Sequence, residues 1–177
     1  MAAYNARTET EEAGIPDFAL LKPDTKCTLN GRSVSLLSYP GTKTVHPDES
    51  VVREPMVAPQ DLVSDLLPMA LHTLGRYPQF DQSPLYLLQC DYADDHGRDD
   101  GQINSFLETH AGERLIWMPI AANASLMINA LKKVLPVCSD SRLRNMTLLY
   151  VGDAGLREVL ESLAQKSGMN FCFHAFY

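Results

Sequence analysis

The chain has 177 residues, a mass of 19.7 kDa, 45% hydrophobic residues and a formal net charge of -7. A chain of this length can bury roughly 70% of its unfolded surface, so one domain with its own core is expected. The negative field repels phosphate backbones and anionic lipid, which argues against nucleic acid or a membrane as a partner.

The sequence carries no targeting or metal-site signal. No stretch approaches the ~18 apolar residues of a membrane span, and no apolar core of ~7–15 residues follows a basic start. The cysteines form no CxxC pair and have no histidine at a zinc-site spacing. We therefore expect a cytoplasmic protein with reduced thiols, no bound metal and no cofactor. The cysteines are Cys27, Cys90, Cys138 and Cys172.

Residues 1–58 predict an N-terminal arm that precedes an α/β domain over residues 59–177. The arm contains a β-hairpin and an extended crossing over the surface. Asn30-Gly31 is typical of a two-residue type I′ turn, which places Cys27 opposite Val34.

A helical period follows the arm. Pro59 opens it, its apolar residues share one face, and Gly75 is placed to end it. Pro68 falls in the middle and removes one backbone donor. It therefore predicts a kink or a split into two helices.

From residue 84 onward, apolar runs alternate with amphipathic stretches. The runs predict strands at 85–90, 115–120, 146–151 and 169–173. The stretches predict helices over 101–111, around 126–135 and over 153–167. Strands joined by such helices are parallel, with right-handed crossovers and helices on both faces of the sheet.

The expected fold class is α/β, a three-layer flavodoxin-like or Rossmann-like sheet of about four parallel strands with an N-terminal β-hairpin. The terminal strand is apolar on both faces around Phe171-Cys172-Phe173. Buried parallel strands have this composition, so we expect it inside the sheet and not at an edge.

In such a sheet ligands bind beyond the carboxyl ends of the strands. The loop after the strand at 85–90 covers residues 91–100, named the acidic segment here, and holds five aspartates against one arginine. Carboxylates this close together repel one another unless water solvates them or a basic group neutralises them. The first hypothesis is therefore a non-enzymatic adaptor, chaperone or immunity-type inhibitor that binds a basic protein partner. Its contact residues would be Asp94, Asp95, His96, Asp99 and Asp100.

The second hypothesis is a metal-dependent phosphoryl hydrolase. Asp91 and Asp153 would supply oxygen ligands to Mg²⁺, and Asp94 or Asp95 would complete the shell. Asp is among the preferred residues at a helix N-cap, so an ordinary capping role for Asp153 is favoured over the metal-ligand role. His96 is the one histidine placed for acid–base work. The dinucleotide, P-loop and α/β-hydrolase motifs are missing. No catalytic, cofactor-binding or metal residue is therefore assigned, and the non-enzymatic hypothesis is favoured.

Overall fold

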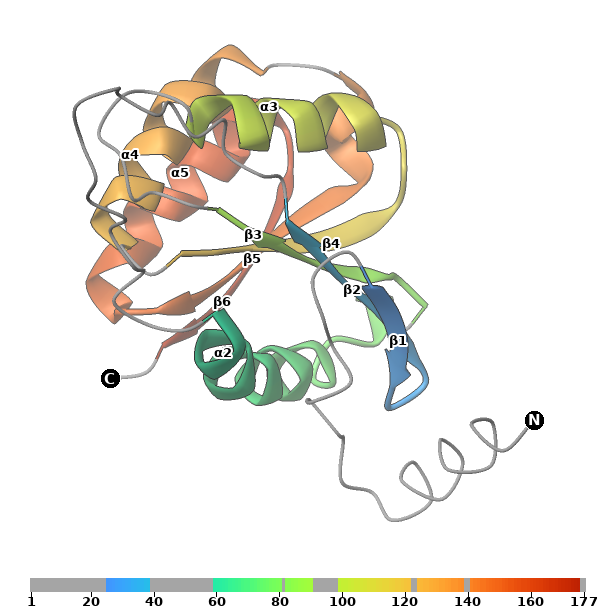
Figure 1. The fold of residues 1–177 in the computed structure, drawn as a ribbon. Helices are drawn as coiled ribbons and strands as arrows, with labels where there is room; N and C mark the ends of the chain where they lie inside the picture. Colours follow the sequence, from blue (N-terminus) through green and yellow to red (C-terminus); the bar gives the residue numbers. More distant parts are fainter. Residues whose placement is uncertain are drawn as a thin grey trace, which may run out of the picture.

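Strands and helices alternate along the described part of the chain, as the apolar runs predict (Figure 1). The computed structural model describes residues 25–38, 59–80, 82–90, 99–121, 124–138 and 141–175. The strands are β1 Thr25–Leu29, β2 Arg32–Ser38, β3 Leu85–Gln89, β4 Leu115–Ile120, β5 Met146–Gly152 and β6 Asn170–Ala175. The helices are α2 Pro59–Leu74, α3 Asp99–His110, α4 Ala124–Val134 and α5 Arg157–Ser167. Most of the arm lies outside the described residues, so the division after residue 58 stays a prediction.

One sheet contains all the described strands, in the order β1-β2-β3-β4-β5-β6. The hairpin has the predicted form, since Asn30 and Gly31 have positive φ of 50° and 75° and Cys27 pairs with Val34. β1 is antiparallel to β2, and every other neighbouring pair is parallel. Because β2 pairs in parallel with β3, the sheet has one parallel strand more than expected. Rossmann and flavodoxin orders reverse partway across the sheet, whereas this order is sequential.

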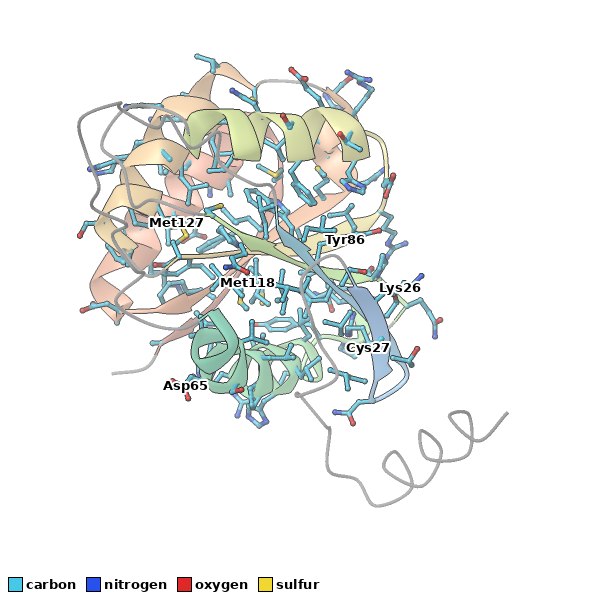
Figure 2. The ribbon with its side chains drawn as sticks, in the orientation of Figure 1. Lys26, Cys27, Asp65, Tyr86, Met118 and Met127 are labelled. Atoms are coloured by element: carbon cyan, nitrogen blue, oxygen red, sulfur yellow. The ribbon has the colours of Figure 1, made fainter. Side chains whose placement is uncertain are left out.

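Helices cover both faces of the sheet, as expected, but unequally (Figure 1). α3, α4 and α5 lie on one face, and α2 lies on the other. Connections that step the same way across a parallel sheet with the same hand put their helices on one face, which accounts for the group of three. The connection from β2 to β3 steps the same way, so the opposite face of α2 gives it the opposite hand. Met127 of α4 belongs to the core under that group, Met118 of β4 to the core under α2, and Asp65 lies on the outer side of α2 (Figure 2).

Two cores hold the layers together. The core under α3, α4 and α5 is centred on Trp117, which is fully buried. Its ring centroid lies 5.4 Å from that of Phe106, and its Nε1 donates to the sulfur of Met169 at 3.4 Å. The core under α2 takes residues from all six strands, and Leu67 of α2 is fully buried in it.

Of the two outcomes predicted at Pro68, the split of α2 is wrong, because the helix runs without interruption from Pro59 to Leu74, and the kink stays a prediction. Pro68 and the residue four positions earlier, Ser64, are both exposed. The carbonyl that loses its intrahelical donor is therefore on the side of the helix that water reaches, which lets the helix continue.

The apolar residues of α5 are not all buried. Leu160, Leu163 and Ala164 are buried against the sheet, but Val159 is 37% exposed. At 100° per residue, Val159 lies at the rim of a stripe centred on the other three positions.

The expected interior place of the terminal strand is also wrong, because β6 is the last strand of the sheet and pairs with β5 alone. Phe173 on one face stacks on Tyr150, and Cys172 on the other face belongs to the core under α2. Apolar residues on both faces of a strand therefore indicate that both faces of the sheet are covered. They do not indicate that the strand pairs with another strand on each side.

Within the described ranges, no helix is both long enough and apolar enough to span a membrane.

Candidate functional site

The acidic segment joins β3 to α3 at the carboxyl edge of the sheet. The residue before it is held against β4, because the N–H of Cys90 donates to the carbonyl of Ile120 at 2.8 Å. Its end forms the first turn of α3. The two elements that carry it are well buried, with Cys90 3% exposed and Ile103 of α3 fully buried.

The five predicted contact residues fall into two groups. Asp94, Asp95 and His96 lie outside the described residues, and the backbones of Asp99 and Asp100 begin α3. An acidic residue in the first turn of a helix is stabilised by the helix dipole. This stabilisation is a structural explanation for Asp99 and Asp100, beside the predicted contact role. The contact role of all five stays a prediction.

The backbone of β4 alternates between its two neighbours. Its Ile116 N–H donates to the carbonyl of Pro84 at 2.9 Å, and its Ile120 carbonyl accepts from Cys90. Alternate residues of a parallel strand bond to opposite neighbours. Even-numbered residues of β4 therefore bond to β3, and odd-numbered residues face β5.

Pro119 separates β4 from β5 at the carboxyl edge. It lies inside β4, within the strand predicted at 115–120, and is buried. Proline has no N–H, and this position would have donated to β5. The ladder between β4 and β5 accordingly ends at Trp117 and Leu148, while the ladder between β3 and β4 continues to Gln89 and Ile120.

Gln89, the last residue of β3, is a site residue that the sequence analysis missed. Its Oε1 atom is buried and has no hydrogen-bond partner among the described residues. Alternation along β3 puts its side chain on the same face as Leu87, toward α2. An unmet buried acceptor is unfavourable by about 1–3 kcal/mol. The sequence signal that could have identified Gln89 is its amide side chain, which follows the apolar residues of the strand predicted at 85–90.

Asp153 follows β5 and acts as a helix cap, as one of its two predicted roles requires. Its carboxylate accepts a hydrogen bond from the N–H of Gly155 at 2.7 Å, at the start of the 3-10 turn Ala154–Leu156 that leads into α5. The metal-ligand role of Asp153 with Asp91 stays untested, because Asp91 lies outside the described residues.

Tyr150 lies beside this cap. Burial raises the pKa of its hydroxyl above the usual 10.0, and the charge of Asp153 raises it further. The folded chain therefore holds this proton more tightly than the unfolded chain, so stability falls as the pH rises above about 10. A Cβ on Gly152 would come within 2.5 Å of the Tyr150 ring, which explains glycine at the end of β5.

Replacing Asp153 by alanine should lower the free energy of unfolding by about 1 kcal/mol, because the Gly155 amide loses its acceptor. Replacing it by asparagine should be nearly neutral, since the amide oxygen can accept the same hydrogen bond. Urea denaturation of the three proteins measures both effects. A Mg²⁺-dependent thermal shift that is present in the wild type and lost in Asp153→Asn would replace the capping role with the metal role.

Two histidines have structural partners. His174 of β6 bonds through Nδ1 to the Thr73 hydroxyl of α2 at 2.8 Å, and that hydroxyl also donates to the carbonyl of Met69 at 2.8 Å. The single hydroxyl proton is thus used, so Nδ1 of His174 donates. His110 of α3 bonds to Glu113 at 3.1 Å.

A hollow of about 430 Å³ lies at the opposite, amino edge of the sheet. Its lining residues are Pro78, Gln79, Gln82, Ser83 and Arg114. The guanidinium of Arg114 donates to the carbonyl of Gln79 at 3.0 Å. Behind it, Arg32 donates to the carbonyls of Phe80 and Ser83 and ties the loop before β3 to β2. The guanidinium groups therefore hold the loop in place.

None of the four cysteines forms a disulfide, and Cys27, Cys90 and Cys172 are buried. Across the described ranges, no three or more His, Cys, Asp or Glu side chains come together in a group that could hold a metal ion. Comparisons of the chain with models of protein families, with curated proteins and with solved structures gave no match.

Proposed function

We propose that this protein is a non-enzymatic interaction protein that binds a basic protein partner through the acidic segment. The observation that carries the proposal is the charge of residues 91–100, five Asp against one Arg, on a chain of net charge -7. The segment runs between a central strand and α3, at the edge where α/β sheets present their ligand sites. Such a surface steers a basic protein toward it and repels acidic ones.

Adaptor, chaperone and immunity-type inhibitor are the classes that fit this mode of binding. A cytoplasmic location belongs to the same proposal, because cysteines that form no disulfide are typical of a reducing compartment. Of the expected fold class, the proposal keeps the wider part, an α/β sheet with helical layers on both faces, because the sequential strand order differs from the flavodoxin-like and Rossmann-like orders.

The partner is to be captured with the full chain from its source cells and identified by mass spectrometry. We expect a basic protein in stoichiometric amount. Association is then measured by stopped flow over a range of salt concentrations. Recovery of acidic proteins only, or of no protein, would contradict the proposal.

Neutralising Asp94, Asp95, Asp99 and Asp100 together to asparagine should slow association with this partner about ten-fold or more at low salt. The steep salt dependence of the wild-type rate should flatten, because fewer charges remain to be screened. The matched control makes the same change of four charges elsewhere. It combines Asp65→Asn, Glu113→Gln, Glu158→Gln and Glu161→Gln, and it should keep most of the wild-type rate. An equal loss in both variants, or none in the first, would remove the segment from the interface.

A further inference from the structure

β6 presents backbone groups that the sheet does not use. The β4–β5 pair Trp117 and Leu148 makes even-numbered residues of β5 bond to β6. The β5–β6 pair Leu148 and Phe171 then makes even-numbered residues of β6 bond back to β5. The N–H and C=O groups of Phe171, Phe173 and Ala175 therefore face away from the sheet, where no described strand pairs with them.

This edge lacks the features that usually keep a sheet edge single, which are charges, prolines and bulges. Asn170–Ala175 contains no Asp, Glu, Lys, Arg or Pro, and its register with β5 is continuous. β1 at the other edge is one residue shorter and carries an exposed lysine, Lys26 (Figure 2). Of the two edge strands in the described part of the chain, β6 is thus the one without charged residues or proline.

Apolar side chains lie on both faces of β6. On the α5 side, the Phe173 ring stacks on Tyr150 with centroids 6.1 Å apart and lies 6.0 Å from Phe171. On the α2 side, Cys172 is 4% exposed. Burial raises the pKa of the Cys172 thiol, and the neighbouring N–H of Phe173 partly lowers it again.

We propose that β6 pairs antiparallel with β6 of a second copy of this chain, which joins two six-stranded sheets into one. The outward N–H and C=O groups of β6 allow a register in which the two-fold axis passes at Phe173. Phe173 then faces Phe173 of the other copy, Phe171 faces Ala175, and each facing pair exchanges hydrogen bonds. Both Phe173 rings stay on the α5 side, so the stacks on Tyr150 meet at the axis.

A second copy fits this edge better than a basic partner does. β6 carries none of the carboxylates that would attract a basic surface, and its alternating pattern is self-complementary under the two-fold operation. Two chains of charge -7 repel at long range, and salt screens that repulsion. Added salt should therefore tighten the dimer, whereas it should weaken binding of a basic partner. This inference does not rest on the proposed function.

Sedimentation equilibrium from about 1 to 200 µM tests the proposal. One strand pair buries less than a standard interface, so we expect a dissociation constant on the order of 10 µM and a rise from 19.7 kDa toward twice that mass. Ala175→Pro removes an outward N–H without touching the ladder to β5, so it should stay monomeric with an unchanged melting temperature. Ala175→Ser keeps the N–H and should dimerise. A wild type that is monomeric throughout, or a proline variant that still dimerises, would overturn the proposal.

Cross-linking tests the register. Residues in a facing pair that exchanges hydrogen bonds have Cα atoms about 5.5 Å apart, which is within disulfide range. Phe173→Cys should therefore give a covalent dimer under mild oxidation. Ala175→Cys should not, because the two copies of residue 175 lie on opposite sides of the axis, about 14 Å apart. Circular dichroism confirms that each variant is folded. Cross-linking of the second variant instead of the first, or of neither, would overturn the two-fold at Phe173.

Discussion

Replacing Leu67 by alanine should lower the free energy of unfolding by about 2–5 kcal/mol. Leu67 is fully buried between α2 and the sheet, and α2 is the one described helix on that face. No second described helix is there to close the cavity. Urea denaturation followed by Trp117 fluorescence and by far-UV circular dichroism measures the loss.

The matched control for this prediction is Ser64→Ala, one turn earlier on the same helix. Ser64 is exposed, and alanine is the better helix former, so the free energy of unfolding should change by less than about 0.5 kcal/mol. A loss below about 1 kcal/mol in Leu67→Ala would mean that α2 is not packed as described.

Trp117→Ala should lower the free energy of unfolding by about 3–5 kcal/mol, the largest effect of a single substitution that we expect. The change removes the ring contact with Phe106 and the hydrogen bond to Met169 from the centre of the larger core. Far-UV circular dichroism is the readout, because the chain has one tryptophan and the variant has none.

Trp117→Phe is the control for this second prediction. It keeps an aromatic ring against Phe106 and loses the indole N–H and part of the volume, so it should lose less than half as much stability as the alanine variant. Equal losses in the two variants would show that the ring contact contributes nothing.

Local chemistry was enough to predict most of the described elements. The Asn30-Gly31 turn and the cap at Asp153 each depend on a few neighbouring residues, and both predictions are confirmed. The apolar stripes of the helices follow from the same short periods. These features need no knowledge of the rest of the chain.

Features that depend on distant segments could not be predicted in this way. The edge position of β6 is set by which strands find partners, and its apolar faces are equally compatible with the centre of a sheet. The position of α2 on the opposite face of the sheet depends on the segment that joins β2 to α2, and the sequence of that segment has no helical or strand periodicity. The continuity of α2 through Pro68 depends on which side of the helix meets water.

The candidate site could be predicted only in outline. The acidic segment does follow β3 at the carboxyl edge, as the strand pattern indicates. The sequence analysis did not predict that β4 and β5 stop pairing after Trp117, although a proline inside a central strand, here Pro119, is a signal of a broken ladder. Gln89 was missed because its buried oxygen is visible only once β3 and α2 are packed together.

The hydrogen bond between Thr73 of α2 and His174 of β6 sets an order of events during synthesis. α2 packs on β5 and β6, and β6 leaves the ribosome about a hundred residues after α2 does. At about 5–20 residues per second, the part of the sheet that β6 supplies is missing for roughly 5–20 s after α2 has been made. The apolar side of α2 is therefore covered only in part, by the strands already made, until translation is almost complete. The apolar residues still exposed during that interval make the nascent chain prone to aggregation.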